Sequence, residues 1–96
     1  MAEIVQIESV APVIFGVLKI VWKDGFAGVV DLRPVFALGE AFAFLRTQPA
    51  RFDSVRASEQ GRKIFWLDDD GDEIDFGSDS LRKRAERQAE VLRHAS

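Results

Sequence analysis

The stretch that decides the fold runs from Val17 to Leu32 and reads V-L-K-I-V-W-K-D-G-F-A-G-V-V-D-L. Two runs rich in apolar residues flank Lys23-Asp24-Gly25, a composition that is typical of a tight turn between antiparallel strands. We therefore expect a β-hairpin here, with Gly25 in the left-handed conformation that glycine adopts most easily.

The length of this turn decides which residues of the hairpin face each other. A two-residue loop would place Leu18 opposite Asp31, whereas a three-residue loop places Leu18 opposite Val30 and Trp22 opposite Phe26. The second register buries more apolar surface, so we expect it. Because side chains alternate between the two faces of a strand, the apolar side chains then share one face. These are Leu18, Ile20, Trp22, Phe26, Val30 and Leu32.

Three further segments predict strands. Residues 3–10 have the pattern of an N-terminal strand that Pro12 ends. Residues 63–67 run into an acidic turn and residues 73–76 return from it, which predicts a second hairpin. Pairing Leu67 with the first residue of the returning strand gathers the apolar side chains on one face: Ile64, Trp66, Ile74 and Phe76.

The middle and the C-terminal end of the chain predict helices. Short helical turns are expected at 34–38, at 40–46 and beyond Pro49. Thr47 is a candidate cap for the last of these turns, and Phe52 and Val55 are expected to point inward. A short edge strand is expected to follow at 55–57. A longer helix is expected over 79–94, and its narrow apolar stripe contains Leu81, Ala85, Ala89 and Leu92. The predicted fold class is therefore α+β: a small antiparallel sheet of two hairpins plus an N-terminal strand, short helices in the middle and a C-terminal helix.

Length and composition limit the possible classes of protein. With 96 residues, the chain predicts a single domain over 1–96. No apolar run approaches the about 20 residues needed to cross a bilayer, and the N-terminus lacks a signal-like segment, so we expect no membrane association and a cytoplasmic location. The chain contains no cysteine, which excludes disulfides, thiolate metal sites and a thiol nucleophile.

Charge is distributed unevenly. Residues 81–96 contain five basic and two acidic side chains, a net charge of +3, whereas the eight basic and fourteen acidic side chains of residues 1–80 give −6. An acidic body therefore carries a basic C-terminal helix.

Four short motifs resemble those of a known family: Trp22-Lys23-Asp24-Gly25, Val30-Asp31-Leu32-Arg33-Pro34, Ile64-Phe65-Trp66 and Ile74-Asp75-Phe76. They are similar to motifs of the uncharacterised bacterial family called domain of unknown function 2442, and the resemblance covers about residues 4–82. It implies a small α+β domain with helices on one side of a sheet. Some relatives are joined to a helix-turn-helix domain, and others accompany a small partner suspected to be a toxin. The helix after Leu81 is too short for a helix-turn-helix, so the resemblance does not imply DNA binding.

The sequence predicts no catalytic, cofactor-binding or metal-binding residue. The turn from Asp68 to Glu73 fails the spacing of a calcium loop, and aspartate with glycine is what a solvated turn prefers; a weak cation site is the alternative. The only histidine, His94, lies near the chain end, where it would not be held in place as a catalytic base. Trp22 and Trp66 alternate with aliphatic residues, which indicates core positions rather than a ligand-stacking site.

The strongest functional indication is the second face of the predicted sheet. It would be apolar too, whereas a half-solvated sheet normally has a polar outer face. The candidate interface residues are Val17, Val21, Val29, Phe65 and Leu67. Either the C-terminal helix covers this face, or a second copy of the chain or a small partner protein does.

These observations predict a non-enzymatic protein-interaction module that either self-associates as a homodimer or higher oligomer or, as the family resemblance implies, neutralises a toxin-like partner. The alternative is a nucleic-acid-binding or regulatory accessory domain that uses the basic helix. Its candidate contacts to phosphate or to a partner are Arg82, Lys83, Arg84 and Arg87.

Overall fold

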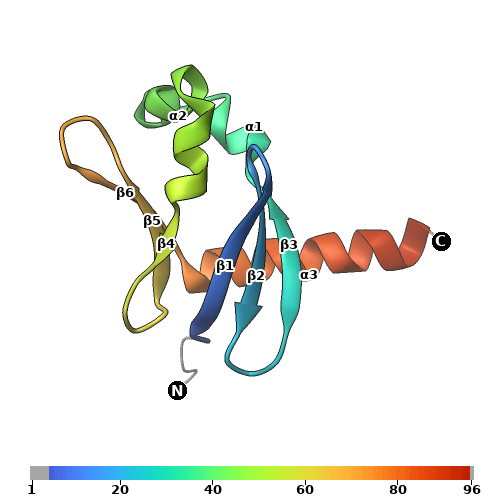
Figure 1. Ribbon diagram of the computed structural model, residues 1–96. Coiled ribbons are helices and arrows are strands. Elements are labelled where there is room, and N and C mark those ends of the chain that lie inside the picture. Colours follow the sequence, from blue (N-terminus) through green and yellow to red (C-terminus); the bar gives the residue numbers. More distant parts are fainter. Residues whose placement is uncertain (1–4, 96) are drawn as a thin grey trace.

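The computed structural model describes residues 5–95, with side chains up to Val91. Figure 1 shows the order of its elements along the chain. They are β1 (Ile7–Ile14), β2 (Val17–Trp22), β3 (Ala27–Asp31), α1 (Arg33–Phe36), η1 (Glu40–Phe42), α2 (Ala43–Thr47), η2 (Pro49–Ser54), β4 (Arg56–Ala57), β5 (Lys63–Leu67), β6 (Glu73–Gly77) and α3 (Ser78–Ala95).

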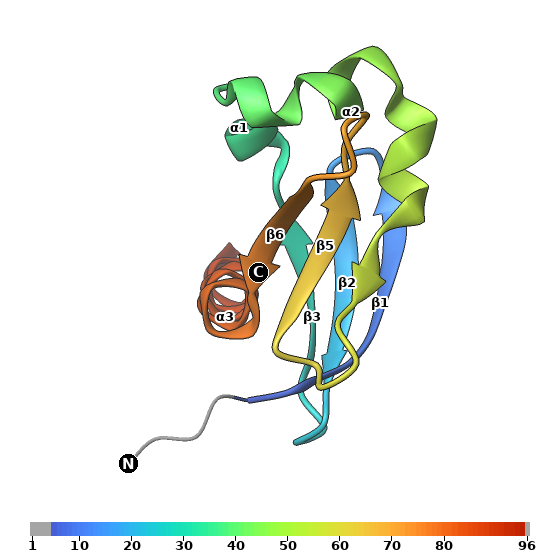
Figure 2. The ribbon, with the colours of Figure 1, turned by 90° about the vertical axis from the view of Figure 1, so that its left-hand side faces the viewer.

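The strands form two antiparallel sheets of three strands each, in the orders β1-β2-β3 and β4-β5-β6. In Figure 2, the second sheet lies in front of the first. α3 lies beside β6 and β3, and the short helices lie across one end of the two sheets. The predicted α+β class, with its hairpins, short helices and C-terminal helix, is confirmed.

Both predicted hairpin registers are confirmed. Leu18 lies opposite Val30, and the Trp22 N–H donates a hydrogen bond of 2.9 Å to the Phe26 carbonyl, which closes a three-residue loop. Gly25 has φ +94°, the left-handed conformation that this turn requires. In the second hairpin, Leu67 lies opposite the first residue of β6, as expected.

The first strand differs from its prediction. β1 runs from Ile7 to Ile14 and continues through Pro12, then turns through Gly16 (φ +84°) into β2. Along β2, the N–H and C=O groups of successive residues point alternately to β1 and to β3, and those of Leu18 point to β3. Pro12 is opposite Leu18, so its missing N–H removes no bond to β2, and an edge strand tolerates proline there.

The short helices follow the predicted sequence signals, with one exception. Pro34 lies in the first turn of α1, and Phe52 and Val55 are buried. Thr47 does not cap η2: its hydroxyl donates to the carbonyls of Ala43 (3.0 Å) and Phe44 (3.3 Å) within α2 instead. This bond within the helix replaces the predicted cap.

One hydrophobic core lies between the two sheets, under the short helices and against α3. It contains Ile7, Leu18, Ile20, Trp22, Val30, Leu32, Phe36, Phe44, Leu45, Phe52, Val55, Ile64, Trp66, Leu81 and Ala85. Both indoles have a polar partner: Trp22 Nε1 donates to Ser78 Oγ and Trp66 Nε1 to the Phe52 carbonyl, each at 3.0 Å. The prediction that both tryptophans are core residues is confirmed, with exposures of 0% and 1%.

The first half of α3 belongs to this core, and the second half does not. Leu81 and Ala85 are buried, and Gly28 of β3 lies so close that an added Cβ would be 2.9 Å from the Ala85 Cβ. Beyond Ala85 the described side chains are exposed, except for the partly buried Ala89. Figure 1 shows this half projecting past β3, on the side of the first sheet away from β4, β5 and β6.

Candidate functional site

The outer face of the first sheet is the side of β1, β2 and β3 directed away from the core. Strand pairing defines it by two rows of side chains that run across the three strands. The rows are Ser9, Val21 and Ala27, and Ala11, Lys19 and Val29. Four of these six side chains are apolar, and Val29 is 40% exposed. The first half of α3 packs against the core beside β3, and the second half projects past this edge strand instead of crossing the sheet, so no helix of the described chain lies over this face.

The five predicted interface residues do not form one surface. Val17, Val21 and Val29 belong to the first sheet, whereas Phe65 and Leu67 lie on the outer face of the second sheet. Because both sheets direct their other faces into one core, the two outer faces lie on opposite sides of the molecule. The alternation of side chains predicted the correct face of each hairpin, but it did not show that the hairpins belong to different sheets.

The five predicted interface residues also differ in how much of each side chain is exposed. Val17 is 7% exposed and therefore buried, which corrects its assignment to an open interface. Val21 and Phe65 are half-buried, and Val29 and Leu67 are 40% and 52% exposed. The C-terminal helix does not cover these residues, contrary to one of the two expected arrangements.

The outer face of the second sheet is the more polar of the two. Phe65 lies between Arg56 and Asp75 on the neighbouring strands. Lys63 forms ion pairs with Glu73 and Asp75, and the hydrogen bond with Glu73 is the main cause that raises the pKa of Lys63. Polar neighbours of this kind are what a solvated sheet face normally carries.

The end of β1 and the turn that follows it expose apolar side chains that the sequence interpretation missed. Val13 and Ile14 are 58% and 56% exposed, and Phe15 is 36% exposed. One side of the Phe15 ring contacts Phe36 and Phe52, at centroid distances of 6.0 and 5.5 Å. The apolar run followed by Gly16 was the available signal, but Pro12 was interpreted as the end of the strand.

Arg82 is committed to contacts within the chain, which corrects its assignment as a phosphate contact. Its guanidinium lies over the rings of Phe26 and Trp22, 4.2 and 5.2 Å from their centroids. It also pairs with Asp24 at 3.0 Å and Glu86 at 3.2 Å. The hydrogen bond from the Phe26 N–H is the largest cause that lowers the pKa of Asp24, and the Arg82 guanidinium lowers it further. Arg82 therefore ties α3 to the turn between β2 and β3.

The other three basic residues point away from the core. Lys83, Arg84 and Arg87 are exposed, and together with Asp79 and Ser80 they line a shallow depression on α3. None of them takes part in an ion pair among the described residues. They remain the part of the predicted basic site that is available to a partner.

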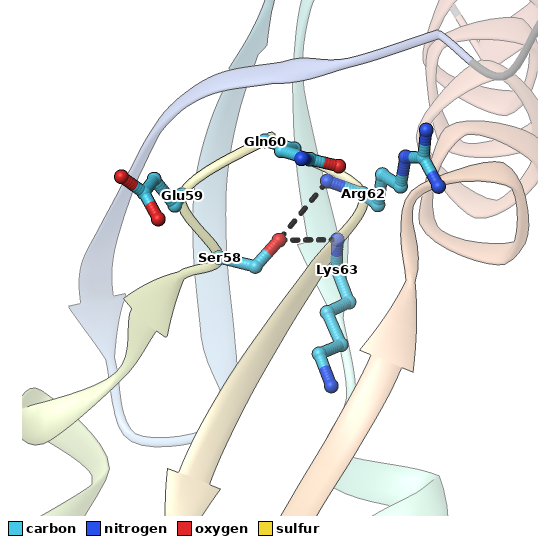
Figure 3. Close-up of a pocket in the computed structure, with 5 residues that line it drawn as sticks. All are labelled: Ser58, Glu59, Gln60, Arg62 and Lys63. Carbon is cyan, nitrogen blue, oxygen red and sulfur yellow. Dashed lines mark hydrogen bonds between the residues drawn. The ribbon is translucent and has the colours of Figure 1, made fainter.

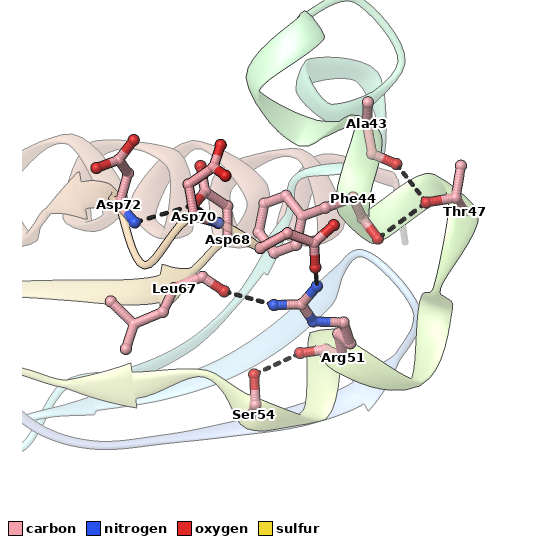
Figure 4. Close-up of polar contacts among 10 residues, drawn as sticks. Ala43, Phe44, Thr47, Arg51, Ser54, Leu67, Asp68, Asp70 and Asp72 are labelled. Atoms are coloured by element: carbon pink, nitrogen blue, oxygen red, sulfur yellow. Dashed lines mark hydrogen bonds and ion pairs between the residues drawn. The ribbon is translucent and has the colours of Figure 1, made fainter.

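The acidic turn is held together by its own backbone. Figure 4 shows Asp68, whose Oδ1 accepts hydrogen bonds of 2.9 Å from the N–H groups of Asp70 and Asp72. Carboxylate oxygens of these three residues lie within 4.8 Å of one another. Arg51 pairs with Asp69 and donates to the Leu67 carbonyl at 2.8 Å. These bonds are the ordinary construction of an aspartate-rich turn, although the three carboxylates would also suit a weakly held cation.

A small pocket of about 280 Å³ lies at the turn between β4 and β5. Figure 3 shows its lining: Ser58, Glu59, Gln60, Arg62 and Lys63. Ser58 Oγ accepts hydrogen bonds from the N–H groups of Arg62 (3.1 Å) and Lys63 (3.3 Å), so the serine is already used to shape the turn. Nothing in the pocket resembles a nucleophile next to a base.

Two carboxylates on the outward faces of the strands have cationic partners. Asp31 forms an ion pair with Arg33 at 2.8 Å, and that guanidinium is the main cause that lowers the pKa of Asp31. Asp75 belongs to the Lys63 cluster, so both strand carboxylates have cationic partners. The side chain of His94 lies outside the described residues.

Comparisons with known proteins gave no match: no family model, no curated protein and no solved structure corresponds to this chain. The resemblance to domain of unknown function 2442 therefore stays a prediction. Among the described residues, no helix has both the length and the apolar character that crossing a membrane requires.

Proposed function

We propose that this chain is a non-enzymatic protein-interaction module that binds another protein chain through the outer face of the first sheet. The observation that carries the proposal is the apolar character of this face, where Val29 remains 40% exposed beside Val21 and Ala27. Covering such side chains is worth about 25 cal/mol per Å² of apolar surface, which favours association. The end of β1, with Val13 and Ile14 exposed, would extend the contact.

The family resemblance suggests one kind of partner, a small toxin-like protein that this module would neutralise. An interaction surface of this kind needs no pocket and no reactive group, which agrees with the way polar side chains are used here. Ser58, Asp68 and Arg82 all bond within the fold.

The experiment compares proteins retained from a cell extract by the immobilised chain and by two variants. Val29→Glu places a carboxylate on the outer face of the first sheet, and Leu67→Glu places one on the opposite face at a similarly exposed position. We expect a specific protein, or further copies of the chain, to be retained by the wild type and by Leu67→Glu but not by Val29→Glu. Equal retention by all three, or none by any, would contradict the proposal.

A second candidate function, nucleic-acid binding, rests on one observation. Lys83, Arg84 and Arg87 lie together on α3 with no ion pair among the described residues. The net charge of −3 opposes this function because the acidic body repels phosphates. Binding to RNA or DNA that weakens steeply with salt and is lost in Arg84→Gln would support it. Absent or salt-insensitive binding would remove it.

A further inference from the structure

The beginning of β1 joins the two sheets through a single peptide group. The Gln6 carbonyl accepts a hydrogen bond of 2.8 Å from the Lys23 N–H in the β2–β3 turn. The N–H of the same peptide group, which belongs to Ile7, donates a hydrogen bond of 2.7 Å to the Gly61 carbonyl in the turn between β4 and β5. Among the described residues, no other backbone hydrogen bond connects a segment of the first sheet with a segment of the second.

The residue before this peptide group is fixed to the start of α3. Ser78 Oγ donates a hydrogen bond to the Val5 carbonyl and accepts one of 3.0 Å from Trp22 Nε1. Ser78 is 1% exposed, so water does not stand in for either partner when its bond is lost. The hydroxyl that holds Val5 therefore also satisfies the buried indole of Trp22.

Apolar side chains of the same segment close the core at this end. Ile7 is 3% exposed and lies opposite Trp22 in the first sheet, and Val5 packs partly buried against the core. Figures 1 and 2 show this end of the molecule opposite the short helices, where the β2–β3 and β4–β5 turns also lie. The chain passes from the first sheet to the second through the short helices at one end, and the backbone of residues 5–7 joins the sheets at the other.

Gly61 fits closely against this segment. Its φ of +69° favours glycine, and an added Cβ would lie 2.8 Å from the Ile7 nitrogen and closer still to the Ile7 carbonyl oxygen. Gly71, in the acidic turn, has a similar φ of +83°, but a Cβ added there meets nothing within 4 Å. The two glycines therefore separate the cost of the left-handed conformation from the cost of pressing on Ile7.

We propose that residues 5–7 form a strap that releases as one unit, and that its release opens the core at Trp22 while the rest of both sheets stays folded. The bonds of the strap lie on consecutive residues, so breaking one of them displaces the partners of the others. A few hydrogen bonds and one buried aliphatic side chain contribute less than the whole fold, so such a segment opens without global unfolding. This opening is independent of the proposed function, because Ala27 and Val29 of the outer face are not part of the strap.

The first experiment follows native-state hydrogen exchange by NMR at low urea concentrations. In the wild type, the Ile7 and Lys23 amides and the Trp22 indole N–H should share one protection factor. That factor should be at least about tenfold below that of the Leu18 amide in β2, and it should depend only weakly on urea because a local opening exposes little surface. The Trp66 indole N–H, whose partner lies in η2 at the other end of the core, should follow Leu18. A Trp22 indole N–H as strongly protected as Leu18 would overturn the proposal.

The second experiment compares two glycine variants in the same measurement. In Gly61→Ala, the protection of the Ile7 and Lys23 amides and of the Trp22 indole N–H should fall by one common factor of at least about tenfold, because the new Cβ displaces the Ile7 backbone. Gly71→Ala has the same backbone strain without the contact and should leave all three at the wild-type value. A fall confined to the Ile7 amide, or an equal fall in Gly71→Ala, would overturn the proposal. Thermal melting checks that both variants fold.

Ser78→Ala releases the strap from its other side, and it replaces Gly61→Ala if that variant does not fold. It removes the hydrogen bond to Val5 without touching the partners of the Gln6–Ile7 peptide group. The Ile7 and Lys23 amides should again lose protection together, by about fivefold or more, the effect of one lost hydrogen bond. If both amides keep their wild-type protection in Ser78→Ala, the bonds of the strap break independently and the proposal is wrong.

Discussion

The two halves of α3 both contain apolar side chains, but these have different surroundings. In the first half, Leu81 and Ala85 are buried, and Arg82 is held by Asp24 and two aromatic rings. In the second half, Ala89 is only partly buried and Val91 is 57% exposed. An amphipathic pattern shows that one side of a helix prefers burial, but it does not show whether the same chain provides the cover.

The largest difference between the halves should appear when one apolar side chain is shortened. Leu81→Ala removes a fully buried side chain and should lower the free energy of unfolding by about 2–5 kcal/mol. Val91→Ala, in the exposed half of the same helix, should change it by less than about 0.5 kcal/mol. Urea unfolding followed by circular dichroism measures both. Equal losses would mean that the two halves are packed alike.

The contact between α3 and β3 offers a second test, with two glycines as a matched pair. Gly28→Ala would bring a new Cβ to 2.9 Å from the Ala85 Cβ, so α3 must shift, at a cost of about 1–3 kcal/mol. A Cβ added at Gly77 meets nothing within 4 Å, so Gly77→Ala should be neutral or slightly stabilising. Thermal melting compares the two variants. A Gly28→Ala protein as stable as Gly77→Ala would show that α3 is not seated tightly on β3.

Much of this fold could be predicted because local rules decided it. The turn at Gly25 needs a residue that tolerates positive φ, and alternation then assigned Leu18 and Trp22 to the core. The same rules failed at Pro12, where tolerance depends on whether the strand lies at an edge. That property belongs to the assembled sheet and cannot be seen in the strand itself.

The candidate site was predicted less well, for a related reason. The alternation of side chains along a strand correctly predicts that Val29 and Leu67 face outward. The two residues lie in different sheets, however, and which sheet a hairpin joins follows from long-range packing. Similarly, Arg82 and Arg84 are the same type of residue and lie two positions apart on α3. Only the position of Asp24 and the rings beside α3 determines that Arg82 bonds inward while Arg84 stays exposed.

These two arginines give the third test of the comparison. Arg82→Gln loses the ion pairs with Asp24 and Glu86 and the contacts over Trp22 and Phe26, and should destabilise the fold by about 1–2 kcal/mol. Arg84→Gln, on the exposed side, should stay within about 0.5 kcal/mol. Chemical denaturation of both variants decides the point. If the two losses are equal, Arg82 contributes no more than a surface charge.

The smallest expected effect concerns pH and the carboxylate that Arg82 contacts. The Phe26 N–H and then Arg82 lower the pKa of Asp24 below its ordinary value of 3.8, so the ionised carboxylate stabilises the folded state above that pH. This contribution is lost as the pH falls through the folded-state pKa. Asp24→Asn should therefore lower the melting temperature slightly at pH 7, and the difference from wild type should shrink towards pH 3.

The two causes can be separated by repeating this comparison in the Arg82→Gln background. The part of the Asp24→Asn effect that disappears there measures the ion pair with Arg82, and the part that remains comes from the Phe26 N–H. If the Asp24→Asn effect is unchanged in that background, the Asp24–Arg82 pair does not fasten α3 to the β2–β3 turn. The first half of the helix would then depend on apolar contacts alone, and the contrast between its two halves would rest on burial without any contribution from charge.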